Sequence, residues 1–267
     1  MLKPISPAAW NEFEDLGYVK LGSLDPETLR SLQERIDAIM LGKAPVDYER
    51  MLMQLDSSDG AYENAGAQTK GFKGSTLNYR KIQDLEYDPL FLEFLQDPVF
   101  KDLCERVYGA DASIAIFRAM FMNKPAHQGT FLPWHQDRWT FLSEDPQVTV
   151  WTALDPATEE NGCVQVIPGS HKNGLINPTH LSGFLSKAQS AAICTEDRIV
   201  HLELEVGEVA LLHNHLLHAS DINRSSQSRR AFSVCYMNAA TQVDGKPSSY
   251  PIAFGEGALR VGELAGV

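Results

Sequence analysis

The residues with the clearest chemical potential are a histidine and an aspartate two positions apart, in the segment Trp134-His135-Gln136-Asp137. In an extended strand, residues two apart point to the same face, so His135 and Asp137 would lie together while Gln136 points away. An imidazole and a carboxylate on one face provide two of the three ligands in the two-histidine, one-carboxylate sites of non-haem iron enzymes. Because such a pair arises often by chance, a metal site also requires a third ligand from elsewhere in the chain.

Three candidates for that third ligand occur in one short segment, His213-Asn214-His215-Leu216-Leu217-His218. Any one of these imidazoles can equally be a partly buried side chain whose nitrogens are satisfied by hydrogen bonds. The residue types therefore fit a metal site, but their spacing does not choose among the three.

Two adjacent arginines downstream of this cluster, Arg229 and Arg230, lead into an apolar run at 232–237. Consecutive side chains of a strand point to opposite faces. Arg229 then shares its face with the small residues Ala231, Ser233 and Cys235, and Arg230 shares the other face with Phe232, Val234 and Tyr236. We expect the first face to line a cavity in which Arg229 can grip a carboxylate through two hydrogen bonds, and the second face to pack in the core.

The first 110 residues, which precede this chemistry, are predicted to be mainly helical support. Helical patterns follow Pro7, which can occupy a first helical turn, and Asp25-Pro26, a cap followed by a first turn. A third helical stretch, at 90–108, is broken near Pro98. Between them, residues 44–75 are polar and rich in Gly, Asp and Ser, so we expect a surface loop or a lid over a site.

From about residue 112 the pattern changes to short apolar runs separated by Gly, Pro, Asn and Asp. Many short strands after an opening set of helices predict a β-barrel or sandwich core buttressed by helices. We expect one domain over residues 1–267, with the β core at 111–240 and a C-terminal tail at 241–267. The predicted strands of the β core are Ser113–Met122, Val148–Leu154, Val164–Ile167, Ile199–Leu204, Glu208–Leu212 and Phe232–Met237.

Composition narrows the classes of partner. The 267 residues carry 23 Lys and Arg against 35 Asp and Glu, a formal charge of −12, which disfavours nucleic acid and anionic membrane surfaces. The four cysteines form no CxxC pair and are expected to be reduced and buried. The N-terminal segment lacks the apolar stretch of a secretory signal, and no uncharged apolar run approaches the roughly 20 residues of a membrane helix. We therefore expect a cytoplasmic protein with a small-molecule substrate; its oligomeric state is not predicted.

Four motifs in this order make the chain resemble the phytanoyl-CoA dioxygenase (PhyH-like) family of iron(II)- and 2-oxoglutarate-dependent oxygenases. The resemblance runs from Gly17-Tyr18-Val19 to about Met237. Its densest parts are Lys124-Pro125 with Pro133-Trp134-His135-Gln136-Asp137; Trp151-Thr152-Ala153-Leu154-Asp155; Glu160-Asn161-Gly162 with Ile167-Pro168-Gly169-Ser170-His171; and Leu217-His218-Ala219-Ser220 with Asn223 and Arg229.

The resemblance implies a double-stranded β-helix, also called a jelly-roll or cupin-like fold, with N-terminal helices packed on it. It implies iron(II), 2-oxoglutarate and O₂ as cofactor and co-substrates, and it selects His218 as the third ligand beside His135 and Asp137. Ser220 and Arg229 match the family positions beside the distal carboxylate of 2-oxoglutarate. The resemblance also places Lys81 and Trp151 near the co-substrate and makes His171 part of a structural turn. Ala219 departs from the family, in which Gly is frequent at this position.

Hydroxylation of an unactivated C–H bond of a small metabolite, with release of succinate and CO₂, is the reaction that the resemblance implies. Asp137 argues against halogenation, because halogenases of this superfamily replace that carboxylate by Ala or Gly. Since no basic patch for a coenzyme A tail is apparent, a free metabolite is favoured, and we expect Phe117, His127 and Trp139 to line its cavity. Two alternatives are a non-catalytic sensor that binds metal and 2-oxoglutarate, and a zinc hydrolase, because two histidines and a carboxylate also suit zinc.

Overall fold

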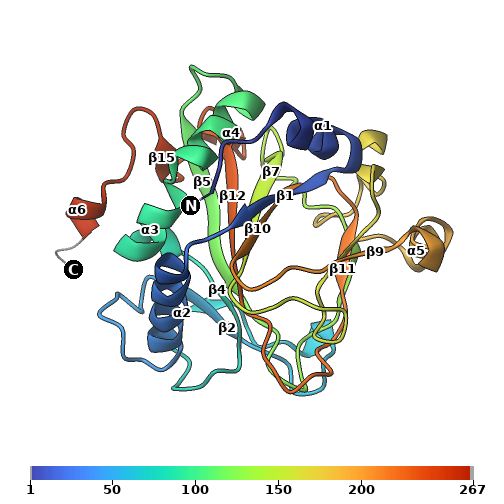
Figure 1. Ribbon diagram of the computed structural model, residues 1–267, viewed down its shortest axis with the longest axis horizontal. Coiled ribbons are helices and arrows are strands. Elements are labelled where there is room, and N and C mark those ends of the chain that lie inside the picture. The colour runs from blue at the N-terminus through green and yellow to red at the C-terminus, as the bar shows by residue number, and fades with distance from the viewer. Residues whose placement is uncertain (1, 265–267) are drawn as a thin grey trace.

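The fold is built on two antiparallel β-sheets, seen in a computed structural model that describes residues 2–264 (Figure 1). Within these residues the larger sheet has nine strands, in the order β1-β10-β7-β12-β5-β4-β2-β3, and β15 pairs with β5. These strands are β1 (Tyr18–Ser23), β2 (Leu52–Leu55), β3 (Thr69–Lys70), β4 (Tyr79–Ile82), β5 (Ile114–Met122), β7 (Val148–Ala153), β10 (Glu208–His213), β12 (Ala231–Asn238) and β15 (Ile252–Phe254).

A smaller sheet of four strands, in the order β6-β11-β8-β9, packs against one face of the larger sheet. Its strands are β6 (Leu132–His135), β8 (Val164–Val166), β9 (Val200–Leu202) and β11 (His218–Ser220), and β13 (Gln242–Val243) pairs separately with β14 (Lys246–Pro247). Apolar side chains fill the space between the two sheets, among them Trp151 and Ala210 of the larger sheet and Val166 and Leu202 of the smaller. The structure is thus mainly β with a double-stranded β-helix core, as expected.

Helices cover the other face of the larger sheet (Figure 1). Phe232 of β12 packs against Phe91 and Phe94 of α3, with ring centroids 4.7 and 5.9 Å apart. The helices are α1 (Pro7–Leu16), α2 (Pro26–Met40), α3 (Pro89–Leu95), α4 (Pro98–Tyr108), α5 (Lys187–Ile193) and α6 (Val261–Leu264), with 3-10 turns η1 (Tyr62–Asn64), η2 (Leu85–Tyr87), η3 (Ser170–Asn173) and η4 (Glu196–Arg198). The expected helical support is therefore present.

Three of these helices begin with the same two residues, Asp and then Pro. The side chains of Asp25, Asp88 and Asp97 each accept hydrogen bonds from backbone N–H groups of the first turn. The proline that follows has a fixed φ suited to the helix and no N–H that would need a partner. Two such starts divide the helical stretch near Pro98 into α3 and α4.

Strand β12 alternates as its sequence predicts. Phe232, Val234 and Tyr236 are fully buried in the core beneath the helices. Ser233 and Cys235 point to the opposite side, where they line a cavity between the sheets. This strand is central in the larger sheet, so its polar face becomes the floor of the cavity.

Two regions are more ordered than their sequences suggest. Within the polar segment 44–75, β2 pairs with β3, and β2 also pairs with β4 just beyond the segment, which joins this group to β5. Beyond residue 240, β15 pairs with β5 at Ile252 and Phe254. The segment 44–75 therefore extends the larger sheet instead of forming only a loop. No helix within residues 2–264 combines the length and apolar character needed to cross a bilayer.

Candidate metal centre and co-substrate cavity

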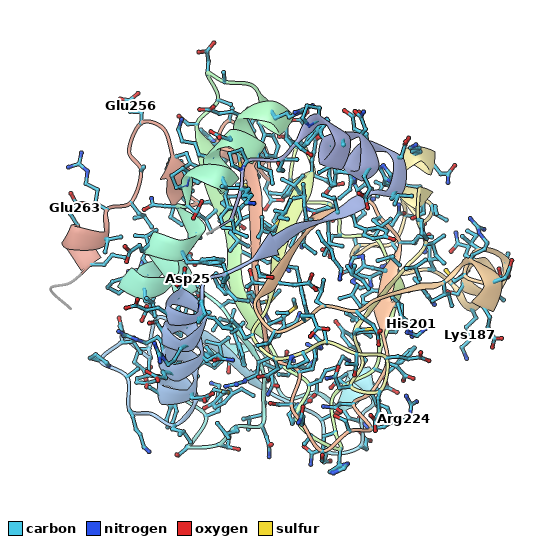
Figure 2. The ribbon with its side chains drawn as sticks, in the orientation of Figure 1. Asp25, Lys187, His201, Arg224, Glu256 and Glu263 are labelled. Carbon is cyan, nitrogen blue, oxygen red and sulfur yellow. The ribbon has the colours of Figure 1, made fainter. Side chains whose placement is uncertain are left out.

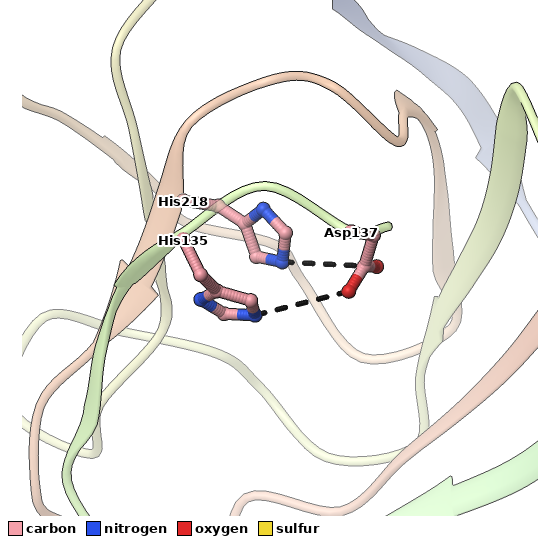
Figure 3. Close-up of side chains that lie close together, drawn as sticks. All are labelled: His135, Asp137 and His218. Carbon is pink, nitrogen blue, oxygen red and sulfur yellow. Dashed lines mark ion pairs between the residues drawn. The ribbon is translucent and has the colours of Figure 1, made fainter. Parts of the chain in front are cut away.

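The pairing of β6 with β11 brings two histidines together. His135, the last residue of β6, lies directly opposite His218, the first residue of β11. Asp137 follows two residues after β6, and its backbone N–H donates to the carbonyl of Asn214 at 2.8 Å. One possible ligand atom from each of His135, Asp137 and His218 lies within 4.8 Å of the others (Figure 3). Within the described residues this is the only such group of three.

Backbone carbonyls orient both imidazoles of the triad. Nδ1 of His135 is 2.8 Å from the carbonyl of Pro133, and Nδ1 of His218 is 2.8 Å from the carbonyl of Leu216. A carbonyl can only accept, so each Nδ1 carries the hydrogen and each Nε2 keeps a free lone pair. The two Nε2 atoms lie 3.8 and 3.9 Å from the two carboxylate oxygens of Asp137 (Figure 3). This separation leaves room for an ion between the three side chains.

The electrostatic setting of His135 also favours the metal-binding form. Burial, together with a smaller effect of the nearby His218, lowers the pKa of His135 to about 3. The imidazole is therefore neutral near neutral pH, which is the form that binds metals.

The other histidines of the cluster have different partners. The ring of His213 packs between Phe13 and His171, with centroids 6.2 and 4.9 Å away. Nε2 of His215 lies 3.4 Å from a carboxylate oxygen of Asp145. His171, expected to be structural, lies with Nε2 3.1 Å from the carbonyl of Glu14 on α1. Neither His213 nor His215 is part of the group of possible ligand atoms.

Arg229 lines the same cavity, and no anionic side chain among residues 2–264 pairs with it. Its side chain is 4% exposed, and its guanidinium carbon is 5.5 Å from the ring centre of Trp151. Within residues 2–264 no carboxylate lies within 4.0 Å of it, and its Nε is buried without a hydrogen-bond acceptor. Burial lowers the pKa of Arg229 to about 10, so the group still carries its charge at neutral pH.

Arg230 points the opposite way and is fully engaged. Its guanidinium makes two hydrogen bonds to Asp155, at 2.9 and 2.8 Å, and one to Asp37 of α2. The two adjacent arginines thus face different sides of the strand, as the alternation of side chains requires.

A cavity of about 560 Å³ joins these features. It is lined by the triad and by five of the residues expected to contact the co-substrate or substrate, which are Arg229, Ser220, Lys81, Trp151 and Trp139. Burial and the charges of Arg80 and Arg118 lower the pKa of Lys81 to about 7. The volume lies within the usual range for small-molecule sites, roughly 300–1,000 Å³.

Phe117 and His127 were expected to line the cavity, but neither is among the residues that line it in the structure. Phe117 sits behind Trp139, with ring centroids 4.5 Å apart. His127 occupies a turn with a φ of 57°, where its backbone N–H donates to the carbonyl of Ser225. Neither position was predictable from residue type, because the turn and the packing depend on distant parts of the chain.

A family model described as phytanoyl-CoA dioxygenase (PhyH) matches residues 13–231, which is most of the chain. This chain belongs to the PhyH family. The family is one of iron(II)- and 2-oxoglutarate-dependent oxygenases, so the resemblance noted in the sequence is confirmed.

Several curated PhyH proteins are similar to the chain. A probable phytanoyl-CoA dioxygenase of Caenorhabditis elegans is 29% identical over 237 residues, which is 85% of this chain and 73% of that protein. The phytanoyl-CoA dioxygenase of Arabidopsis thaliana is 32% identical over 152 residues, 56% of this chain and 53% of that protein. The chain therefore spans only about half of some relatives that it matches.

Solved structures share the fold at low sequence identity. EctD from S. alaskensis, in its apoform, has a TM-score of 0.69 and 19% identity, with 92% of this chain and 82% of that chain covered. SnoK, titled a non-heme alpha-ketoglutarate-dependent carbocyclase, has a TM-score of 0.64 and 16% identity, with 90% of this chain and 87% of that chain covered. These likenesses support the double-stranded β-helix fold of this PhyH protein.

Sequence analysis overlooked several residues that shape the site. Phe184 stacks on the His135 ring at a centroid distance of 4.9 Å. Asn214, whose carbonyl fixes Asp137, accepts a hydrogen bond from Thr149 and donates one to Cys235. Arg118 also lines the cavity. Its signal was available, because it is a lone charged residue in the apolar run of β5, whereas Phe184 and Asn214 carried none.

Proposed function

We propose that this protein hydroxylates an unactivated C–H bond of a small metabolite, with His135, Asp137 and His218 holding iron(II) and Arg229 holding 2-oxoglutarate. The observation that carries the proposal is the charged, buried guanidinium of Arg229, which has no carboxylate partner in residues 2–264 yet opens to the same cavity as the triad. A buried charge without a partner is costly, so a ligand carboxylate is the natural complement.

The donor set fits iron(II). Two neutral imidazole nitrogens and one carboxylate on one side of an ion are the ligands of non-haem iron oxygenases. The Nε2 lone pairs of both histidines and the Asp137 oxygens converge on one point (Figure 3). These three residues would hold the ion from one side and leave its other side open to 2-oxoglutarate and O₂.

The surroundings of Arg229 fit the distal carboxylate of a five-carbon dicarboxylate. Its planar guanidinium can donate two parallel hydrogen bonds to a carboxylate. Ser220 lies on β11, two residues after His218, and supplies a hydroxyl in the same cavity, while Trp151 covers the guanidinium face. Lys81 lies on β4, in the cavity wall, and supplies an amine that a bound anion would favour in its protonated form.

When bound, iron(II) would supply the activation of O₂, so that 2-oxoglutarate and O₂ yield succinate and CO₂ while one oxygen atom is inserted into the substrate C–H bond. The protein's own task is to hold the reactants and to limit access of water. Asp137 is held by its hydrogen bond to Asn214, and His135 is held by Pro133 and Phe184. A zinc hydrolase would leave Arg229 without a use.

Coupled binding and turnover test the proposal. We expect the protein to bind one iron(II) and, only then, 2-oxoglutarate tightly under anaerobic conditions, and to release succinate and CO₂ when O₂ and a substrate are added. A matched control is His213→Ala, which alters a histidine outside the triad. Failure to bind 2-oxoglutarate in the iron-loaded protein would contradict the proposal. Binding of 2-oxoglutarate without succinate formation across a broad metabolite panel would favour a sensor instead.

A further inference from the structure

The cavity is strongly cationic although the chain as a whole is acidic. Among its lining residues the only carboxylate is Asp137. The same lining includes six basic residues, which are Arg80, Lys81, Arg118, Lys124, Arg138 and Arg229. Cations in a partly enclosed, low-dielectric cleft raise the local concentration of anions. The field inside the cavity is therefore opposite in sign to the formal charge of −12.

Three of these cations are already engaged by the protein. Arg80 donates to the side chain of Gln54 at 2.9 Å, Lys124 donates to the carbonyl of Thr130 at 2.6 Å, and Arg138 donates to the carbonyl of Pro178. Arg229 and Lys81 are assigned to 2-oxoglutarate under the proposed function. The remaining cation is Arg118.

Arg118 is placed in the cavity by an irregularity of β5. Arg118 pairs with Cys235 of β12, but the next pair joins Ile116 to Tyr236, so Phe117 is an extra, bulged residue. Directly opposite residues of an antiparallel pair share a face. Arg118 therefore points to the cavity side with Cys235, and the bulge lets Phe117 pack on that side too, against Trp139. Bulges beside active sites commonly redirect side chains in this way.

Aromatic stacking holds Arg118 without using its donors. Its guanidinium carbon lies 4.9 Å from the ring centre of Trp139 and 5.0 Å from that of Phe117. Stacking occupies the face of the guanidinium, whereas its five N–H donors lie in the plane. Within residues 2–264 no carboxylate lies within 4.0 Å of Arg118, and Arg118 is not among the residues with fully buried, unpaired atoms. The donors therefore remain accessible from the cavity.

Arg118 and Arg229 extend from well-separated points of the β5–β12 ladder. Arg229 continues the β5–β12 ladder, because its N–H and carbonyl bond to Lys124, six residues beyond Arg118. At about 3.3 Å per residue, the two arginine backbones lie roughly 20 Å apart. Asp137 is fixed near the Arg118 end, since its partner Asn214 also contacts Cys235. The co-substrate can extend from the metal to Arg229, which leaves Arg118 for a second anion.

We infer that the primary substrate is a small oxyanion, bearing a carboxylate or a phosphate monoester on an apolar skeleton, and that Arg118 binds its anionic group. This inference rests on the proposed function. The apolar part of such a molecule would lie against Trp139, Phe141 and Met120, which line the same cavity. The chemistry of Arg118 is common to both oxyanions, so the test separates them.

Matched six-carbon probes test the inference. Hexanoate, hexyl phosphate and hexanamide are titrated by calorimetry into the protein loaded anaerobically with iron(II) and 2-oxoglutarate. We expect one of the two anions to bind at least about tenfold tighter than the amide, because a charge-assisted bond contributes more than a neutral one. Arg118→Gln should abolish this preference, and Arg118→Lys should keep part of it. Arg260→Gln removes an exposed charge outside the cavity and should change nothing.

The outcomes separate this inference from the proposed function. Equal binding of acid, phosphate and amide by the wild-type protein would overturn the inference, as would a preference that survives in Arg118→Gln. A loss of 2-oxoglutarate affinity in Arg118→Gln equal to the loss of probe affinity would assign Arg118 to the co-substrate and also overturn it. If the wild-type protein binds no 2-oxoglutarate at all, the proposed function fails first. Melting temperatures of the variants check that each is folded.

Discussion

At the scale of single residues, the choice of metal ligands follows from where each imidazole finds its hydrogen bond. His135 and His218 give their Nδ1 hydrogens to backbone carbonyls two residues earlier, which leaves Nε2 for an ion. His215 lies instead beside Asp145, and His213 packs against other rings. We therefore expect His218→Ala to lose iron(II), while His213→Ala and His215→Ala keep most of it. Iron titration of the three folded variants measures this difference.

A further variant, His135→Ala, removes the other histidine of the triad. It should abolish succinate formation while the protein stays folded, because only two ligands remain. Near-normal turnover in His135→Ala, or loss of iron in His215→Ala alone, would show that the triad is misassigned.

The two adjacent arginines provide a second prediction. Truncating one partner of a buried charge-assisted pair costs about 2–5 kcal/mol, so Arg229→Ala should weaken 2-oxoglutarate binding by roughly 30-fold or more. Iron affinity should be largely spared. Arg230→Ala should leave 2-oxoglutarate affinity nearly unchanged but lower the melting temperature, because it breaks the bonds to Asp155 and Asp37. Anaerobic titration and thermal unfolding of both variants measure the two effects, and a reversed order of 2-oxoglutarate affinities would contradict the assignment.

The sequence predicted some of these residues better than others. That Arg229 and Arg230 point to opposite faces of the strand was predictable, because the alternation of side chains depends only on neighbouring residues. The placement of Phe117 was not, because it depends on a bulge that appears only when β5 pairs with β12. The same holds for His127, which lies in a turn with a φ of 57° and is not among the residues that line the cavity. Arg118 was recognisable in the sequence as a lone charged residue within an apolar strand. Its contact with Trp139 was not predictable, because Trp139 lies in a loop distant in the sequence.

At the scale of elements, regular patterns were predictable and short edge strands were not. The Asp-Pro starts of α2, α3 and α4 are local signals, and the apolar runs of β5, β7 and β12 are buried on the helix-facing side. Strands β2, β3 and β4 have two to four residues each and lie in or beside a polar segment. Their hydrogen bonds come from a ladder that begins at β5, so their own sequence carries little strand signal.

A third prediction concerns η2, the short turn between β4 and α3. Its Glu86 is 5% exposed, and its Oε2 lacks a hydrogen-bond donor. Burial raises the pKa of Glu86 to about 8 from an ordinary value of 4.5, with a smaller contribution from Asp84. The folded state therefore binds more protons than the unfolded chain between these two pH values. The free energy of unfolding should fall as pH rises through that window, by at most about 1.4 kcal/mol per pH unit from this group.

Glu86→Gln removes the titrating group with little change of shape. The variant should gain stability relative to the wild-type protein as pH rises from 5 to about 8 and show no further relative gain above that. Urea unfolding of both proteins at several pH values measures their difference in free energy of unfolding. The prediction concerns how this difference changes with pH, not its size at any one pH. Parallel curves for the two proteins would mean that Glu86 is not held in its neutral form.

At the scale of the whole molecule, charge is distributed unevenly between surface and interior. Acidic groups such as Glu256 and Glu263 lie on the outside of the fold (Figure 2), whereas the cavity between the sheets is lined by six basic residues and one carboxylate. The net charge of a chain is therefore a poor guide to the field inside its binding cavity. The absence of a basic patch in the sequence argued only against a coenzyme A tail, and the cations that line the cavity come from separate segments that only the fold brings together.

The proposed ligands would also link the two sheets. The three proposed metal ligands belong to β6, β11 and the residues just after β6, within or beside the smaller sheet. Arg229 lies immediately before β12 of the larger sheet. The metal alone should therefore stabilise mainly the smaller sheet, and 2-oxoglutarate bound to both the metal and Arg229 should tie that sheet to β12. Ligands that bind only the folded state stabilise it by mass action, by about 2.7 kcal/mol at 100 times the dissociation constant.

Hydrogen exchange of backbone amides measures this link directly. We expect iron(II) under anaerobic conditions to slow exchange in β6 and β11, and added 2-oxoglutarate to slow it further there and also at the start of β12, because local opening of either sheet then requires loss of the ligand. Removal of the metal with a chelator should reverse both effects. In Arg229→Ala the response of β6 and β11 to iron should remain, while protection of β12 by 2-oxoglutarate should disappear. Protection of β12 that persists in this variant would mean that the co-substrate reaches the larger sheet through residues other than Arg229.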